Sequence, residues 1–197
     1  MPATRRLVLA STSRYRRELL LRLGLPFECW SPGVDEALLE HEPAARAAER
    51  LAVAKARAAA GRFPDALIIG ADQVATCGPL RLDKPLTHEN AVRQLTAVSG
   101  RRATFDTAVA LLDAASGDLR SRVVPTEVHF RPLSAAAIES YLRREQPYDC
   151  AGSAKAEGLG IALIARVDSE DPTALVGLPL IALTELLAAA GLPALGA

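Results

Sequence analysis

One stretch near the middle of the chain decides the fold, Leu67-Ile68-Ile69-Gly70-Ala71-Asp72-Gln73. Its apolar part, residues 67–71, is typical of a strand that is buried on both faces of a sheet. Two polar residues, Asp72 and Gln73, follow at once. Because ligands of open α/β sheets bind beyond the carboxyl ends of the strands, Asp72 is a candidate metal ligand or general base. The alternative is a carboxylate that only caps the next turn.

Strand and helix patterns alternate on both sides of this stretch. Further strands are expected at residues 7–10, 27–30, 104–112, 119–130 and 161–167, with a hairpin turn at Ser116-Gly117-Asp118. Helices are expected at residues 16–23, 43–61, 87–99, 134–144 and 180–190, several with a capping residue at one end. This order predicts an α/β fold, a mixed twisted sheet with helices on both faces. We expect a single domain of residues 1–197 with two lobes, the second built around the hairpin and helix of residues 101–150.

The composition argues against two classes of function. The chain carries 23 basic and 23 acidic side chains, a pI near 6.8 and only 4% aromatic residues. This balance disfavours a nucleic-acid binder, which needs a basic surface. No apolar stretch approaches the roughly 18 residues that span a bilayer, and the apolar run at residues 7–10 is too short for a signal peptide.

Because Cys29, Cys77 and Cys150 are far apart and odd in number, we expect reduced thiols in a cytoplasmic protein.

A basic and hydroxyl-rich segment follows the first expected strand, Ser11-Thr12-Ser13-Arg14-Tyr15-Arg16-Arg17. Hydroxyl groups, the amides of a helix N-terminus and guanidinium groups together form a typical anion site. Ser11, Ser13 and Arg16 are therefore candidate phosphate ligands. A capped helix with a solvated basic face would explain the same residues without a ligand.

Several other segments carry weaker signals. Lys84 lies in a loop before a helix, and Asp35-Glu36 follows the second strand, where a carboxylate could add a metal ligand. Lys55 stands in an alanine-rich helix and either reaches into a cleft or, as is commoner, extends to the surface. The glycine-bearing segment 150–160 lacks the spacing of a P-loop, although its glycines would let the backbone approach a ligand closely.

Taken in order, these segments resemble the Maf family of nucleotide pyrophosphatases over nearly the whole chain. The resemblance is carried by the following residues: Leu9-Ala10-Ser11-Thr12-Ser13, Arg16-Arg17-Glu18-Leu19-Leu20, Val34-Asp35-Glu36, Ala54-Lys55-Ala56, Ile69-Gly70-Ala71-Asp72-Gln73, Lys84-Pro85, Leu95 to Gly100 and Cys150-Ala151-Gly152. No single segment is decisive, but the ordered set is specific. The resemblance implies two lobes around a deep cleft, a divalent metal such as Mg²⁺ or Mn²⁺, and a homodimer. Some members of the family are linked to restraint of cell division.

Within the family, the chain looks most similar to the branch that acts on 7-methyl-GTP. The similarity lies in Ala151-Gly152-Ser153, Lys155 to Ile161 and Leu175 to Leu180. The family chooses its base at positions that correspond to Tyr15, Gln73 and Glu157, where the branch acting on dTTP and UTP has arginine, threonine and glutamine. Two residues depart from the pattern. Arg14 stands where the family usually has proline, and Tyr15 stands where this branch often has tryptophan.

The resemblance and the chemistry of these side chains predict hydrolysis between the α- and β-phosphates of a nucleoside triphosphate. Asp72, with Asp35, would hold the metal, and Asp72 or a metal-bound hydroxide would activate the water. Lys55 and Lys84 belong to the catalytic set with Asp72, since they offset negative charge in the transition state. The phosphates would be held by Ser11, Ser13, Arg16, Lys55 and Lys84.

The expected base recognition follows from charge. Methylation at N7 makes guanine cationic, so the ring of Tyr15 could stack on it. Glu157 could accept hydrogen bonds from the N1–H and N2–H₂ edge, and Gln73 could bind one more polar atom of the base. The alternative is that Tyr15 packs in its helix and Glu157 faces solvent. Two rival functions stay open, hydrolysis of dTTP or UTP, and a catalytically silent nucleotide-binding regulator of cell division.

Overall fold

The computed structural model describes residues 5–37 and 39–195. Within these ranges it contains five α-helices and a seven-stranded mixed sheet, with the bounds β1 Leu7–Leu9, α1 Arg14–Leu21, β2 Glu28–Cys29, α2 Ala44–Ala60, β3 Leu67–Cys77, β4 Leu80–Arg81, α3 His88–Val98, β5 Arg102–Asp113, β6 Leu119–Phe130, α4 Ala135–Glu145, β7 Ile164–Ser169 and α5 Leu180–Ala189. Three short 3₁₀ turns are η1 (Ala151–Ser153), η2 (Leu159–Leu163) and η3 (Ala174–Val176). The predicted α/β class with a mixed sheet is confirmed. Among the residues described, none of the helices has both the length and the apolar character to cross a membrane.

The sheet places β1 beside the first three residues of β3. The strand order is β2-β1-β3-β5-β6-β7, with β4 paired to β3. β1 runs parallel to β2 and β3, with Val8 opposite Glu28 and Leu7 opposite Leu67, whereas β6 and β7 are antiparallel. The pairing of β1 with β3 reaches Ile69, so β3 continues past the end of β1. The predicted residues Asp72 and Gln73 lie in this continuation.

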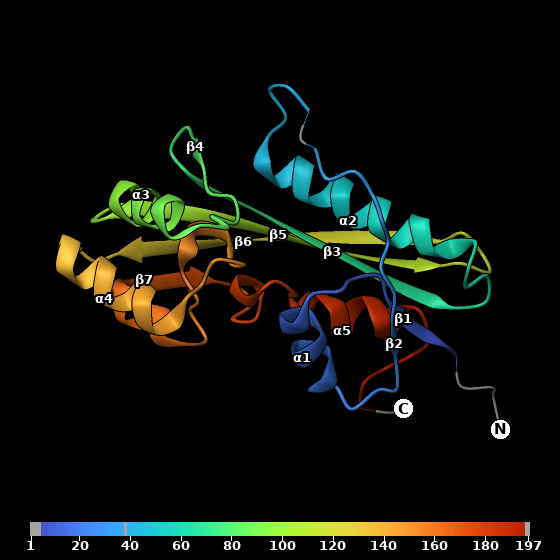
Figure 1. The fold of residues 1–197 in the computed structure, drawn as a ribbon. Helices are drawn as coiled ribbons and strands as arrows, with labels where there is room; N and C mark the ends of the chain where they lie inside the picture. The colour runs from blue at the N-terminus through green and yellow to red at the C-terminus, as the bar shows by residue number, and fades with distance from the viewer. Residues whose placement is uncertain (1–4, 38, 196–197) are drawn as a thin grey trace. The chain divides into compact units, whose positions relative to one another are not determined.

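One compact unit is formed by the described parts of residues 1–73, 107–124 and 171–197. Within it, α2 covers one face of the strands, and α1 and α5 cover the other face (Figure 1). Alternate residues divide between the faces, because Leu67 and Ile69 pack toward α1 and α5 while Ile68 packs toward α2. All three side chains are fully buried. The prediction of a strand buried on both faces is therefore confirmed.

The other compact unit comprises residues 74–106 and 125–170. In this unit α3 packs against α4 and against the η1 turn, and β7 pairs with β6. The buried hydroxyl of Ser153 donates to the Gln94 side chain at 2.7 Å, which ties η1 to α3. The arrangement of two lobes around a cleft stays a prediction.

Capping side chains set where three of the helices begin. Ser13, Thr87 and Ser134 accept hydrogen bonds from first-turn amides of α1, α3 and α4. With Ser13 as the cap, α1 begins at Arg14, earlier than the expected residue 16. The late strand begins at Ile164, later than expected, because the preceding residues form the η2 turn.

Candidate active site

The side chain of Lys55 lies buried between α2 and β3. Its Nζ is 2.5 Å from Asp72 Oδ1 and 2.6 Å from Glu36 Oε1. Lys55 and Asp72 are only 5% and 7% exposed, so this ion pair is largely removed from water. A charge buried to this extent needs a partner, and here each residue supplies one for the other. Lys55 thus reaches inward rather than to the surface. We refer to Glu36, Lys55 and Asp72 as the Lys55 cluster.

Gly70 explains how α2 comes close enough to β3 for this contact. A Cβ atom at this position would lie 2.0 Å from the backbone oxygen of Ala52 and 2.8 Å from the backbone nitrogen of Ala56. Only glycine fits against the helix here. Gly70 and Asp72 share one face of β3, because side chains alternate along a strand. The close approach therefore sets Lys55 directly over Asp72.

Arg16 belongs to the same electrostatic environment. Its Nε donates to the carbonyl oxygen of Gly177 at 2.9 Å. Burial lowers the pKa of Arg16, and the negative charges of Asp72 and Glu36 act against this shift. The first unit thus brings a guanidinium, an ammonium and two carboxylates into one neighbourhood. Such a set can bind phosphate oxygens and a divalent cation together.

The hydroxyl-rich loop lies beside β3, since the amide of Ala10 donates to Ile69 O at 2.8 Å. Ser11 is buried and its Oγ accepts from the amide of Ser13 at 3.2 Å, while Ser13 Oγ accepts from the amide of Arg16 at 3.4 Å. The interpretation of this segment as a capped helix is therefore correct. It is compatible with anion binding, because first-turn amides have no partner inside the helix. The serines as phosphate ligands stay a prediction.

Asp72 and Gln73 point to opposite faces of β3. Asp72 contacts Lys55 on the α2 face. On the other face, Gln73 Nε2 donates to Thr107 Oγ1 at 2.9 Å and to two carbonyl oxygens of the η3 turn at 3.1 Å each. Because β3 continues past the end of β1, a ligand that contacts both residues would lie at this edge of the strand.

The ring of Tyr15 has a cation on its face, and that cation belongs to the same chain. The Arg14 guanidinium lies 4.7 Å from the ring centroid, and its Nη2 donates to the phenol oxygen at 2.6 Å. A base that stacks on Tyr15 would displace Arg14 or use the opposite side of the ring.

Two predicted residues, Lys84 and Glu157, belong to the second unit and are exposed. Glu157 lies between glycines whose close contacts are with the protein itself. A Cβ atom at Gly160, for example, would lie 2.5 Å from the backbone oxygen of Lys155. The glycines of this segment therefore serve internal packing, and the meeting of Lys84 and Glu157 with Asp72 stays a prediction.

The adjacent carboxylates Asp35 and Glu36 have different environments. Asp35 is exposed and accepts from the amide of Ala37 at 2.9 Å, a turn that aspartate commonly forms. The side chain of Glu36 is also exposed, but its Oε1 contacts Lys55 Nζ. Sequence reasoning chose Asp35 and missed the contact of Glu36, because two neighbouring carboxylates give no signal for which one meets the lysine. Asp35 as a metal ligand stays a prediction.

The Lys55 cluster offers the hard oxygen donors that Mg²⁺ and Mn²⁺ prefer. Lys55 contacts one oxygen of Asp72 and one oxygen of Glu36. Asp72 and Glu36 are the residues that would hold a divalent cation here. The donors present thus fit the metal that the family resemblance implies.

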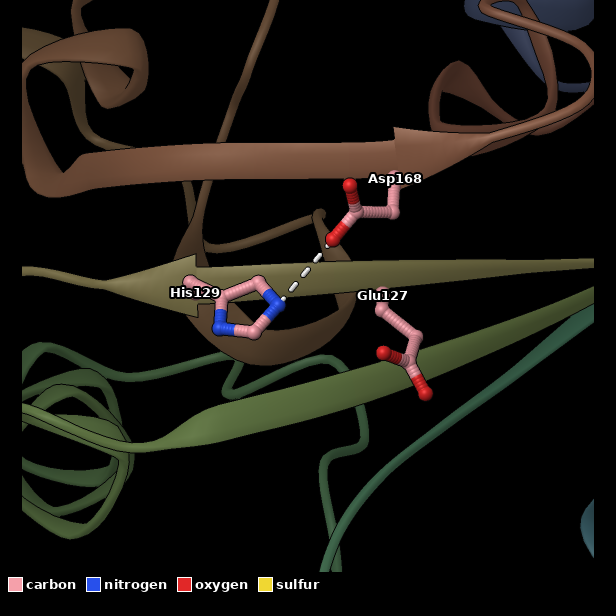
Figure 2. A group of neighbouring side chains, drawn as sticks. All are labelled: Glu127, His129 and Asp168. Atoms are coloured by element: carbon pink, nitrogen blue, oxygen red, sulfur yellow. Dashed lines mark hydrogen bonds and ion pairs between the residues drawn. The ribbon is translucent and has the colours of Figure 1, made fainter.

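A second group of metal-ligating side chains lies on β6 and β7 (Figure 2). Glu127, His129 and Asp168 each offer one ligand atom, and these atoms all lie within 4.8 Å of one another. Glu127 is the cross-strand partner of Asp168, and His129 Nε2 lies 3.1 Å from Asp168 Oδ2. We refer to these three residues as the His129 group. Sequence reasoning missed it, because the strand pairing that brings Asp168 to the other two has no local signal.

Arginines already bind both carboxylates of the His129 group. Arg102 lies 3.1 Å from Glu127, and Arg166 lies 2.7 Å from Asp168. The hydrogen bond from Arg166 is the main cause of the lowered pKa of Asp168, and His129 adds to it. A metal ion could bind this group only by competing with these arginines. The arrangement therefore resembles an exposed cross-strand ion-pair network more than a metal centre.

Comparison with known proteins gives a consistent result. The family described as Maf-like protein matches residues 6–190. A relative from Thiobacillus denitrificans is 58% identical over 96% of this chain and 94% of its own length. Relatives from Methylobacillus flagellatus and Nitrosococcus oceani are 57% and 53% identical, over 94% and 98% of this chain and 96% and 98% of their own lengths. All three relatives carry the name 7-methyl-GTP pyrophosphatase.

Proposed function

The chain belongs to the Maf-like family, and on this basis we propose that it is an enzyme that hydrolyses the α–β phosphate bond of a nucleoside triphosphate. Its preferred substrate is 7-methyl-GTP, and the products are 7-methyl-GMP and diphosphate. The names and the identity of the relatives support this substrate. The buried contact of Lys55 with Asp72 is the observation that carries the catalytic part of the proposal.

Asp72 has the central role in this proposal. Hydrolysis needs a water positioned for attack on the α-phosphorus and a group that accepts its proton. Lys55 holds Asp72 through one carboxylate oxygen, so the second oxygen is kept in place to accept that proton. When bound by Asp72 and Glu36, a divalent cation would offset phosphate charge and lower the pKa of a bound water.

Cationic side chains offset the charge that grows on the leaving diphosphate. The guanidinium of Arg16 can hold two oxygens at once, whereas Lys55 acts as a compact point charge. Lys84 is assigned to the same set. Because Lys55 is largely removed from water, its charge acts more strongly than it would at the surface. Ser11 and Ser13 add hydroxyl and amide donors at the start of α1.

Base recognition is assigned to Tyr15, Gln73 and Glu157. The contact of Arg14 with the Tyr15 ring supports a cation-binding role for that ring, and N7-methylated guanine is a cation. Glu157 accepts from the donor edge of the guanine and complements its charge. The expected Mg²⁺ or Mn²⁺, the homodimer and the cytoplasmic location belong to the same proposal.

Hydrolysis of UTP or dTTP is the nearest alternative, and a silent nucleotide-binding regulator is the alternative from another class. A silent regulator needs no base for water. The buried carboxylate Asp72, held by a lysine with Arg16 in its field, therefore favours an enzyme.

A nucleotide panel tests the proposal. We expect the purified protein with Mg²⁺ or Mn²⁺ to release diphosphate from 7-methyl-GTP faster than from UTP, dTTP or GTP at equal concentration. A chelator should abolish the release, and excess metal should restore it. A preference for either pyrimidine nucleotide would contradict the substrate assignment. Nucleotide binding without diphosphate release would favour the regulator.

A further inference from the structure

Thr107 lies fully buried behind Gln73, and no role in the reaction has yet been given to it. We propose that Thr107 is a positioning residue, which with the η3 turn orients the Gln73 amide so that only its carbonyl oxygen is available to the base. This inference rests on the proposed function. It concerns how the same site chooses its substrate.

The contacts of Gln73 allow only one orientation of its amide. The amide nitrogen lies 2.9 Å from Thr107 Oγ1, 3.1 Å from Ala174 O and 3.1 Å from Leu175 O. In the reversed orientation the amide oxygen of Gln73 would face two carbonyl oxygens. Carbonyl oxygens cannot donate a hydrogen bond, so neither contact could form. The three atoms nearest to Nε2 are all oxygens. The amide nitrogen and oxygen can therefore be told apart from the positions of the heavy atoms alone.

The hydroxyl of Thr107 links the two sides of this arrangement. Thr107 Oγ1 donates its single hydrogen to Ala174 O at 2.9 Å, so toward Gln73 it can only accept. Thr107 is fully buried, and water cannot replace its hydroxyl. Serine at this position would keep both hydrogen bonds, whereas valine would keep the shape of the side chain and lose both.

The η3 turn that supplies the two carbonyl oxygens is itself held in place. Asp171 is 2% exposed, and its carboxylate accepts from the amide and hydroxyl of Thr173 at 3.0 and 2.6 Å and from the amide of Ile181 at 2.6 Å. The oxygen of the Thr173 hydroxyl also accepts from the amide of Leu180 at 2.8 Å. These bonds close the turn on both sides, so its carbonyl oxygens keep their direction. The carbonyl of Gly177, directly after the η3 turn, accepts from Arg16.

The acceptor half of the Gln73 amide is left for a ligand. No group in the described part of the chain hydrogen-bonds its Oε1 atom. Among the described residues, every buried side-chain nitrogen or oxygen has a partner, so Gln73 Oε1 must reach solvent. Gln73 is therefore an acceptor only. The group of the base that binds Gln73 Oε1 is therefore an N–H donor. A base that places an acceptor lone pair against Oε1 is disfavoured.

Kinetics of Thr107→Val and Thr107→Ser test the inference with the preferred nucleotide of the panel. Thr107→Val should raise KM about tenfold and leave kcat within about twofold, since a hydrogen bond that orients the base is weakened while the Lys55 cluster is intact. Thr107→Ser should restore KM to within about threefold of the wild type. In a Gln73→Ala background, Thr107→Val should have no further effect on KM. Independent, multiplying effects of the two changes would overturn the proposal.

A second measurement does not depend on any substrate. In the free protein, the side-chain NH₂ of Gln73 should exchange with solvent slowly in the wild type and in Thr107→Ser, and clearly faster in Thr107→Val. The exposed side-chain NH₂ of Gln94, which donates to Asp83 O, is the internal reference. Unchanged exchange in Thr107→Val would overturn the positioning role. A wild type that hydrolyses no nucleotide would instead refute the proposed function, and the exchange rates would still decide the orientation of Gln73.

Discussion

The Lys55 cluster and the His129 group contain similar chemistry in different surroundings. Each joins two carboxylates to a nitrogen base, and each is built from segments far apart in the sequence. In the first, Lys55 and Asp72 are almost fully buried, and only Glu36, at 61%, is exposed. In the second, the side chains of Glu127 and Asp168 are 39% and 42% exposed and each binds an arginine. Burial and the supply of cations, rather than residue type, separate a candidate active site from a surface network.

The difference matters because burial makes charge both costly and effective. Water screens the pairs of the His129 group, so each contributes little to stability or to reactivity. The pair of Lys55 with Asp72 interacts in a medium of lower dielectric, where an unpaired charge is expensive and a placed charge acts strongly on a reacting phosphate. Substitutions in each group therefore test this contrast.

Lys55→Met should have the largest effect on stability. The substitution leaves Asp72 buried without its cation, which costs about 3–5 kcal/mol in comparable cases. Urea unfolding of both proteins at neutral pH measures the loss. The double variant Lys55→Met with Asp72→Leu is the control, because it removes the unpaired charge and should recover most of the stability. A single variant as stable as the wild type would show that the pair is not buried in solution.

Gly70→Ala should disturb the Lys55 cluster without changing any charge. The new Cβ atom would lie 2.0 Å from Ala52 O, so α2 must move away from β3 and carry Lys55 with it. Overpacking of this kind costs about 1–3 kcal/mol, and kcat should fall as well. Gly117→Ala, in the hairpin turn where a Cβ meets no atom within 4 Å, is the comparison. Although its φ of +77° adds some strain, it should leave kcat unchanged. Equal kcat values for the two variants would contradict the role of Gly70.

Arg14→Ala tests the role of the Tyr15 ring and should have a smaller effect, on KM alone. Removal of the guanidinium frees the ring face for a cationic base, and an exposed cation–π contact is worth about 0.5–1 kcal/mol. The KM for 7-methyl-GTP should therefore fall about two- to fivefold. The KM for UTP, which carries no cationic base, should change less. A rise in KM would mean that Arg14 itself binds the substrate.

Asp168→Asn should have the smallest effect. Because the pKa of Asp168 is lowered in the folded protein, its ion pairs stabilise the fold above the unfolded pKa near 3.8 and lose this effect as the pH falls through the folded pKa. The variant should be slightly less stable than the wild type at pH 7 and equally stable near pH 2. Urea midpoints at both pH values measure this. A large loss at pH 7 would contradict the description of the His129 group as a surface network.

Much of the fold could be predicted from local patterns. The run at residues 67–71 and the starts of α3 and α4 depend on nearby residues, and the structure places them close to the expected ranges. The length of β3 could not be predicted, because the strand continues through Asp72 and Gln73 to Cys77. Polar residues end a strand pattern in the sequence. In the folded chain, partners on both faces satisfy them.

The candidate site could be predicted only in part. Lys55 and Asp72 were chosen for their residue types and their place in the resemblance, and the structure brings them together. The contact of Glu36 with Lys55, the Thr107 hydroxyl and the carbonyl oxygens of the η3 turn had no signal of their own. Their positions depend on which strands pair and which turn packs behind them, and these contacts join residues distant in the chain.

The most direct test of the account is the turnover of Asp72→Asn beside that of Asp168→Asn, with the preferred nucleotide and saturating metal. The two substitutions remove the same charge, one from the Lys55 cluster and one from the His129 group. The account predicts that Asp72→Asn lowers kcat by about 10²–10⁴-fold, the usual contribution of a general base, while Asp168→Asn stays within about twofold of the wild type. An Asp72→Asn protein that keeps most of its activity, or an equal loss in both variants, would contradict it.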